Sequence, residues 1–169
     1  HWPRGIKAKG EIRSQFVHVI DVAPTVLEAA GLPQPESVNG IQQDVIEGVS
    51  MRYSFDEPKA AERHETQYFE IFGNRGIYHK GWTAVTKHRT PWASMTQKVP
   101  AFDEDVWELY SDNDWTQAKD LSGEMPEKLH ELQRQFIIEA TRYKVLPLDD
   151  RFMEKINPDT AGRPVLVRG

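Results

Sequence analysis

Two side chains in the sequence could bind an anionic substrate group, and they lie far apart along the chain. His18 belongs to a largely apolar run, residues 15–20, just before an expected helix. A neutral imidazole can donate a hydrogen bond to an anionic ester, although a lone histidine in such a run is usually a packed residue. Arg75 follows Gly73-Asn74 in an expected hairpin, where it could line a pocket or pair with a carboxylate instead. We take His18 and Arg75 as the candidate substrate-binding residues.

Two further motifs suggest metal or nucleophile chemistry, and both fail on spacing. A calcium loop counted from Asp112 needs glycine at its sixth position and glutamate at its twelfth, where the sequence has Gln117 and Gly123. We therefore interpret the acidic run at 111–114 as turn-forming residues. Residues 48–52 lack the second glycine and the preceding strand of a nucleophile elbow. Neither motif therefore supplies a catalytic residue or a metal ligand, and we name none in this chain.

The helix expected to follow His18 has clear start and stop signals. Asp21 can accept hydrogen bonds from the first free amides of a helix, and Pro24 falls in the first turn, where its missing N–H breaks no helical bond. Gly31 favours the left-handed conformation that ends a helix, and Pro33 blocks continuation. One stripe is apolar at helical spacing and is expected to be buried in a core. It consists of Val22, Val26, Ala29 and Ala30.

The second half of the chain is expected to form a small antiparallel sheet with a helix on one face. Aromatic and β-branched runs predict about three or four strands. The runs are 67–72, 75–78, 82–86 and 106–110, with a hairpin turn at 79–81. Residues 126–143 carry an apolar stripe at helical spacing, after a proline suited to the first helical position. Because a one-sided sheet must bury its apolar face, the sequence predicts an α+β fold.

The connections between these elements carry fewer signals. Residues 33–66 are rich in proline, glycine and acids, and within them Val38-Asn39-Gly40-Ile41 is a typical turn sequence. The loop 87–105, which contains Trp92, and the hairpin at 73–75 are candidate walls of a substrate pocket. The proline-containing tail from residue 144 is expected to be extended.

Composition excludes several partners. The 169 residues carry 26 acids against 21 bases, a formal charge of −5, so nothing indicates binding to nucleic acid or to an anionic membrane. No segment approaches the roughly 20 apolar residues of a membrane helix. The absence of cysteine excludes disulfides and thiolate metal sites. It leaves the compartment open between periplasm and cytoplasm.

Three segments, taken in order, carry a family resemblance. Residues 21–33, Asp-Val-Ala-Pro-Thr-Val-Leu-Glu-Ala-Ala-Gly-Leu-Pro, look like the helix that follows the catalytic half of sulfatases. Residues 1–6, His-Trp-Pro-Arg-Gly-Ile, resemble the end of the core strand just upstream. Residues 107–110 with Asp120-Leu121, followed by 126–129, resemble the C-terminal subdomain of that family. The resemblance spans nearly the whole chain and is closest to bacterial arylsulfatases, of the alkaline phosphatase superfamily.

The resemblance implies how the chain is divided. Residues 1–66 would be the end of an α/β sulfatase-type core with a connector. Residues 67–146 would be a C-terminal α+β subdomain, with a small antiparallel sheet packed against a C-terminal helix, and 147–169 an extended tail. The sequence starts at His1 without a methionine, and we expect it to be the C-terminal portion of a longer protein.

The resemblance also implies an activity for that longer protein, the hydrolysis of sulfate esters of the aryl type. Sulfatases convert a Cys or Ser in a Cys/Ser-x-Pro-x-Arg motif to formylglycine and bind calcium or a similar ion. This chain lacks the motif, so the chain alone is expected to be inactive. Its expected partners are the upstream catalytic part of the same protein and a small-molecule sulfate ester. An apolar surface left uncovered without that part could also drive oligomers.

Two other functions remain open from the sequence. The longer protein could hydrolyse phosphonate or phosphate monoesters, as a sister class of the same superfamily does. Alternatively, the chain could be a non-catalytic interaction module, which would require a core large enough to fold independently.

Overall fold

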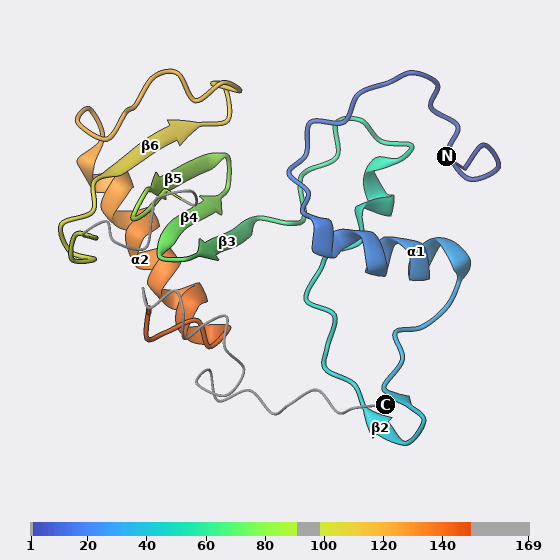
Figure 1. The fold of residues 1–169 in the computed structure, drawn as a ribbon. Coiled ribbons are helices and arrows are strands. Elements are labelled where there is room, and N and C mark those ends of the chain that lie inside the picture. The colour runs from blue at the N-terminus through green and yellow to red at the C-terminus, as the bar shows by residue number, and fades with distance from the viewer. Residues whose placement is uncertain (1, 91–98, 150–169) are drawn as a thin grey trace. The chain divides into compact units, whose positions relative to one another are not determined.

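The computed structural model describes residues 2–90 and 99–149. The chain divides into two compact units, His1–Glu65 and Thr66–Gly169, which we call unit 1 and unit 2 (Figure 1). Trp92, the predicted pocket-wall residue, lies outside the described residues, as does most of the expected tail.

The predicted helix of unit 1 is confirmed. A short 3-10 turn, η1 (Val19–Asp21), leads directly into α1 (Val22–Ala30). Gly31 ends the helix in the left-handed conformation, at φ 69°, and the Leu32 N–H donates to the Leu27 carbonyl at 2.9 Å. The Gly31 N–H likewise donates to the Glu28 carbonyl at 3.1 Å. These two hydrogen bonds satisfy carbonyls at the helix end that would otherwise lack a partner.

Two details predicted for this helix are wrong. Asp21 occupies the N-cap position, but its carboxylate makes no capping hydrogen bond to the helix. The apolar stripe is not buried, since Val22 is 50% exposed and Val26 is 59% exposed, and the buried residue of the helix is Thr25. The physical reason is that the described part of unit 1 packs against α1 through polar groups, which leaves the aliphatic side of the helix uncovered.

The connector of unit 1 contains more structure than the sequence indicated. The turn at Asn39-Gly40 joins β1 (Ser37–Val38) to β2 (Ile41–Gln42) in a two-stranded hairpin. Further on, η2 (Met51–Ser54) forms a single 3-10 turn. Its start is capped by Ser50, whose hydroxyl accepts a hydrogen bond from the Arg52 N–H.

Unit 2 contains the predicted antiparallel sheet. Its strands pair in the order β3-β4-β5-β6, so every neighbour in sequence is also a neighbour in the sheet. The strands are β3 (Thr66–Ile71), β4 (Asn74–His79), β5 (Trp82–Thr86) and β6 (Trp107–Ser111). The first hairpin turns at Phe72-Gly73, with Ile71 opposite Asn74, and not at Gly73-Asn74 as the sequence suggested. Phe72 and Gly73 both have positive φ, as this tight two-residue turn requires.

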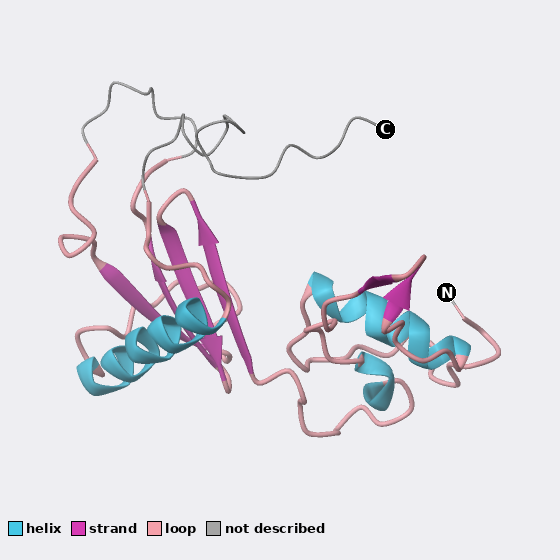
Figure 2. Cartoon of the chain, turned by 90° about the horizontal axis from the view of Figure 1, so that it is seen from below, coloured by secondary structure: helices cyan, strands magenta, loops and turns pink. Residues whose placement is uncertain are grey.

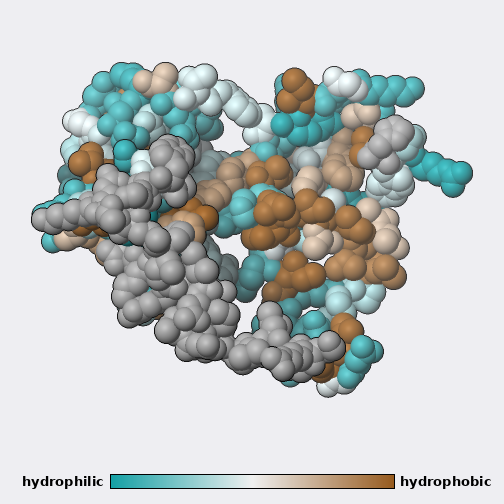
Figure 3. All heavy atoms as spheres, in the orientation of Figure 1, coloured by the Kyte–Doolittle hydropathy of each residue, from teal (hydrophilic) through white to brown (hydrophobic). Residues whose placement is uncertain are grey.

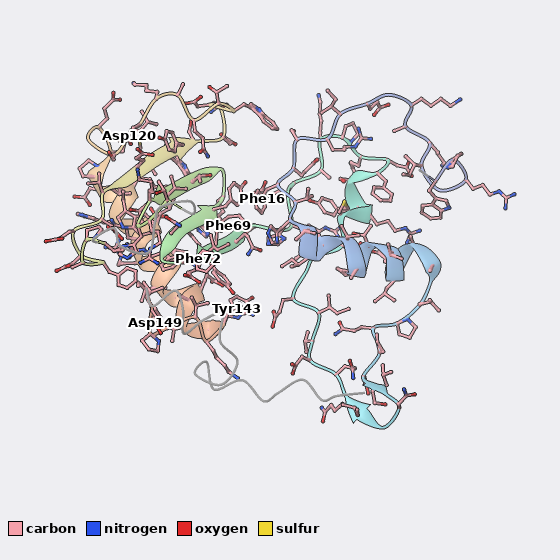
Figure 4. The ribbon with its side chains drawn as sticks, in the orientation of Figure 1. Phe16, Phe69, Phe72, Asp120, Tyr143 and Asp149 are labelled. Atoms are coloured by element: carbon pink, nitrogen blue, oxygen red, sulfur yellow. The ribbon has the colours of Figure 1, made fainter. Side chains whose placement is uncertain are left out.

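The helix α2 (Pro126–Arg142) covers one face of this sheet (Figure 2). Its buried stripe meets a row of side chains that crosses the sheet at equivalent positions. The resulting core consists of Ile77, Ala84 and Leu109 from the sheet and Leu132, Phe136 and Ala140 from α2, each at most 1% exposed. The end of α2 is tied to the edge strand by Tyr143, labelled in Figure 4, whose ring stacks on Tyr68 with centroids 5.3 Å apart. The predicted α+β class is therefore confirmed.

Candidate functional site

The most deeply buried charged group of unit 1 is the Asp21 carboxylate, which is 0% exposed. It accepts three hydrogen bonds from three parts of the chain. The His18 N–H donates to Oδ2 at 2.8 Å, the Val49 N–H to Oδ1 at 2.7 Å, and His64 Nδ1 lies 2.8 Å from both oxygens. A buried carboxylate is tolerated only when its oxygens are satisfied in this way. Asp21 therefore joins the start of α1 to the connector and to the end of unit 1.

The neighbouring backbone is packed closely enough to require a glycine. A Cβ on Gly48 would lie 2.1 Å from the Ile20 carbonyl oxygen, far inside van der Waals contact. Thr25 adds a second tie, because its hydroxyl donates to the Asp21 carbonyl at 2.6 Å and accepts from the Met51 N–H at 2.9 Å. Gly48, in the segment where the sequence spacing excluded a nucleophile elbow, thus serves the packing of the connector on the helix start.

His18, the first candidate substrate-binding residue, lies beside this cluster. Its ring is 6.5 Å from the ring of His64, at 74°, and the edge of Phe16, labelled in Figure 4, packs on His64 at 5.4 Å. When Asp21 accepts from the Nδ1–H of His64, the tautomer of that ring is fixed and its Nε2 can act as an acceptor. An aspartate that orients a histidine in this way is a common support for a base or an anion site. The structure therefore brings His18 together with a histidine that the sequence did not single out.

Arg75, the second candidate, is held in a buried cluster of unit 2. Its guanidinium donates to the Asp105 carboxylate and, at 3.2 Å, to the Phe102 carbonyl. His88 reaches the same carboxylate, with Nδ1 2.8 Å from Oδ2. The side chains of Asp105 and His88 are both 0% exposed. Arg75 therefore pairs with a carboxylate, the alternative that the sequence left open.

Aromatic rings pack around the Arg75 guanidinium and bring Phe102 and His88 together. The Arg75 guanidinium lies 5.2 Å from the Phe102 ring and 5.3 Å from the Trp107 ring, distances at which a cation is attracted to an aromatic face. The ring of His88 stacks on Phe102 with centroids 4.2 Å apart. A Cβ on Gly73 would meet His88 at 2.5 Å, so the predicted wall at residues 73–75 is filled by this packing.

The sequence missed His64, His88 and Asp105 as cluster members, for a simple reason. His64 meets Asp21 across 43 residues, and Asp105 meets Arg75 across 30. Contacts over such distances follow no helical or strand period, so only the fold brings these residues together. His18 and Arg75 belong to different units, and we treat their surroundings as two separate clusters.

The acidic turn after β6 has the structural role that its residue types predicted. Asp114 accepts from the Lys119 N–H at 2.9 Å and from the Thr116 hydroxyl at 3.0 Å, and the bond from Lys119 is the main reason that the pKa of Asp114 is lowered. Asp120, labelled in Figure 4, accepts from the Leu109 N–H at 2.9 Å and from Ser122. The backbone bond from Leu109 is the largest cause of its lowered pKa. These carboxylates close turns by imitating backbone acceptors.

Unit 1 also has an open hollow of about 670 Å³ whose lining mixes both signs of charge. Arg52 reaches Glu28 at 3.4 Å, and the Arg63 guanidinium lies 4.5 Å from the centre of the Tyr53 ring. A hydrogen bond from Ser50 is the main cause of the lowered pKa of Glu28. These two arginines are thus already engaged by neighbours, and acidic and basic side chains both line the hollow.

Two features are absent from the part of the chain that the structure describes. No set of three or more His, Cys, Asp or Glu side chains is arranged to hold a metal ion there. Nor does that part contain a helix with the length and hydropathy needed to cross a membrane.

The likeness that the comparisons find is to solved structures, at low sequence identity. No family model matches the sequence, and no curated protein matches it. A solved structure from Bacteroides thetaiotaomicron, designated BT33336S-sulf, belongs to a core genetic locus that orchestrates the metabolism of multiple glycosaminoglycans. It is 16% identical to this chain, with a TM-score of 0.46 over 72% of this chain. The match takes in 24% of that protein, so this chain spans about a quarter of its length.

Proposed function

We propose that this chain is the C-terminal part of a sulfatase, an enzyme that hydrolyses sulfate esters, with aryl sulfates as the substrate class. The proposal is supported by the order of the three family-like segments along the sequence. The structural observation that carries it is the uncovered aliphatic side of α1. In a sulfatase-like protein this side would pack on the upstream catalytic part, and unit 1 would be completed only in the longer protein.

The uncovered surface is substantial. Val19 is 73% exposed, beside Val22 and Val26 at about half exposure, and Leu32 after the helix is equally open. Figure 3 shows hydrophobic residues gathered over this unit. Burial of such side chains stabilises by roughly 1.5–3 kcal/mol each when it is complete. A surface of this kind favours a covering partner over exposure to water.

Under this proposal the chain contributes support and part of the substrate rim, while formylglycine and a calcium ion act in the upstream part. The described residues offer no ligand set for such an ion, and no step of the reaction is assigned to them. Between the two candidate rim residues, His18 suits the role better, because the Arg75 guanidinium already binds Asp105. An imidazole at the rim could donate a hydrogen bond to the ester oxygens.

The test is an assay of the longer protein after formylglycine maturation, with an aryl sulfate, an aryl phosphate and a phosphonate ester as substrates. We expect turnover of the sulfate ester. Preference for the phosphate or phosphonate ester would instead support the sister class of hydrolases. Absence of turnover with all three would contradict an enzymatic role and favour the interaction module.

A pair of variants tests the proposed packing of α1 in the same protein. Val26→Asp places a charge on the uncovered side of the helix, whereas Gln42→Asp places one on the exposed hairpin. We expect Val26→Asp to lower the yield of soluble, active protein and Gln42→Asp to leave it unchanged. Equal yields would show that this side of α1 faces solvent in the whole protein, contrary to the proposal.

The interaction module predicts a different behaviour of the 169-residue chain by itself. A self-sufficient module would elute as a monomer, bind little hydrophobic dye and unfold in a cooperative transition. We expect oligomers and dye binding instead, because unit 1 exposes its aliphatic residues. A monomer without dye binding would favour the module.

A further inference from the structure

We propose that Asn39, at the tip of the β1–β2 hairpin, is a site of spontaneous deamidation that converts it to aspartate and isoaspartate. The inference is independent of the proposed function. The Asn39-Gly40 turn belongs neither to unit 2 nor to the two buried clusters.

The reaction needs only the chain and water. The backbone nitrogen of Gly40 attacks the side-chain carbonyl carbon of Asn39, loses its proton, and expels the amide nitrogen as ammonia. The resulting five-membered succinimide is opened by water at either carbonyl. One opening gives aspartate, and the other gives isoaspartate, in which the backbone runs through the former side chain. No oxidant or reductant takes part.

The surroundings of Gly40 leave the attack unobstructed. No atom outside the immediate chain lies within 4 Å of the position that a Cβ on Gly40 would occupy. Glycine also adds no side chain of its own next to the attacking nitrogen. Asn39 and Gly40 have φ values of 52° and 79°, the left-handed pair of a tight hairpin turn. The attack requires Asn39 to rotate out of this conformation, so the rate depends on how easily the hairpin opens.

The hairpin should open easily. It contains only two residue pairs, Ser37 with Gln42 and Val38 with Ile41, and one further bond from the Gln43 N–H to the Glu36 carbonyl at 2.9 Å. All four strand residues are exposed. An isolated two-stranded hairpin of this kind is at best marginally stable in water. We therefore expect the hairpin to open readily enough for Asn39 to reach the conformer that reacts.

Asn74 provides an internal comparison within the same chain. Its side-chain oxygen accepts from the His88 and Arg89 N–H groups, at 2.9 and 3.0 Å, and its amide nitrogen donates to the Ile71 carbonyl at 3.0 Å. Each net hydrogen bond lowers the open population by roughly fivefold. Since three must break, deamidation at Asn74 should be about a hundredfold slower than at Asn39 on this account alone. The side chain of Arg75 slows it further.

The product would alter the connector locally. Deamidation adds one negative charge to the formal −5 of the chain. That charge lies in a segment, residues 34–48, which already holds Glu36, Asp44 and Glu47 and no lysine or arginine. Isoaspartate also lengthens the backbone by one carbon inside a two-residue turn, which removes the strand register.

The experiment is a time course of the intact chain in mildly alkaline buffer, followed by peptide mapping with mass spectrometry that separates aspartate from isoaspartate. We expect modification at Asn39 with both products, and about a hundredfold less at Asn74. Asn39→Gln should remove the deamidation products from the hairpin peptide, because the longer glutamine side chain cannot form the five-membered succinimide. In the chain unfolded in urea, the deamidation rates of Asn39 and Asn74 should lie closer together, because the hydrogen bonds of the Asn74 side chain are then broken.

Two outcomes would overturn the proposal. Asn39 could remain intact in the folded chain while a synthetic peptide of residues 34–47 deamidates, which would mean that the hairpin holds the turn closed. Alternatively, Asn74 could react as fast as Asn39 in the folded chain, which would mean that the hydrogen bonds around Asn74 give no protection.

Discussion

The two units of the chain are held together by opposite kinds of interior. In unit 2, six apolar residues are buried between the sheet and α2, among them Ile77, Leu109 and Phe136. In the described part of unit 1 every buried residue is polar, namely Asp21, Thr25, Ser54 and His64. Unit 2 thus has a hydrophobic core of the ordinary type, whereas unit 1 has a hydrogen-bonded centre with aliphatic residues outside.

This difference teaches which unit can stand by itself. Apolar burial contributes about 25 cal/mol per Å², and it adds up over a packed core. A hydrogen bond contributes only about 1 kcal/mol net, although it costs more than that to leave a buried partner unsatisfied. The polar centre of unit 1 can therefore specify how its segments meet but supplies little net stability. We expect unit 2 to be the more stable unit, and unit 1 to depend on a cover for α1.

The largest test of this comparison is Phe136→Ala, which empties the middle of the unit 2 core. Phe136 is 1% exposed, and its ring packs edge-on against that of Trp107, with ring centroids 5.9 Å apart. We therefore expect Phe136→Ala to lower the free energy of unfolding by about 3–5 kcal/mol. Hydrogen exchange of the full chain, read by peptide, should show faster exchange throughout β3 to β6 and α2. The exposed Ile137→Ala, one residue further along the helix, is the control and should change little. Comparable effects of the two variants would mean that the core does not govern unit 2.

Asp21→Asn tests the polar centre of unit 1. The asparagine amide keeps a single acceptor oxygen, so its NH2 group would face the N–H of either His18 or Val49, which leaves that buried donor without an acceptor. An unsatisfied buried donor typically costs about 1–3 kcal/mol. We expect faster exchange at residues 18–30 and 45–64 with unit 2 unaffected. Asp44→Asn, on an exposed side chain, is the matched control. An unchanged exchange pattern in Asp21→Asn would show that the carboxylate is not what joins these segments.

Tyr110 gives unit 2 a pH dependence at the alkaline end. Burial first, and then the hydrogen bond to Glu108, raise the pKa of Tyr110 from 10.0 to about 12. Because the folded state favours the neutral hydroxyl, its contribution is complete below about pH 10 and is lost as pH rises towards 12, by roughly 2 kcal/mol. Urea midpoints measured across this range should fall less steeply in Tyr110→Phe than in the parent chain. The same slope in both would contradict this role for Tyr110.

The finest test separates two ways of replacing His64. The amide nitrogen of asparagine can take the place of Nδ1 and still donate to Asp21, whereas that of glutamine lies near the position of Nε2. We therefore expect His64→Asn to retain most of the stability of unit 1 and His64→Gln to lose about 1 kcal/mol more. Thermal unfolding with hydrogen exchange at residues 18–30 would measure the difference. A larger loss in His64→Asn would mean that Nε2, and not Nδ1, makes the important contact.

Much of unit 2 could be predicted from local signals. The strand at 82–86, the turn at Lys80-Gly81 and the helix from Pro126 follow from residues close in sequence, whose period of two or of 3.6 determines which side is apolar. The predicted turn of the first hairpin lay one residue too far along the chain, because Phe72 has a strand-forming side chain but adopts the positive φ of the turn. Aromatic propensity favoured the strand there, and the register of β3 with β4 decided otherwise.

The candidate sites were less predictable. His18 and Arg75 were chosen by residue type, and the partners that determine their surroundings, His64 and Asp105, lie tens of residues away. The sequence also assigned the α1 stripe to a core, since amphipathic spacing indicates which side of a helix is apolar. It does not indicate whether that side has been covered.

By itself, the amino-acid sequence determined the elements of this protein, because helix ends, tight turns and apolar periods depend on neighbours within a few residues. The tertiary structure alone decided that Asp21 would be buried against two distant donors, Val49 and His64. It also decided that Arg75 would bind Asp105 and that the aliphatic side of α1 would face outward. Those outcomes depend on which segments meet in space. Hydrogen bonds and apolar contacts form between whichever groups the fold brings within reach, and no local pattern records that choice.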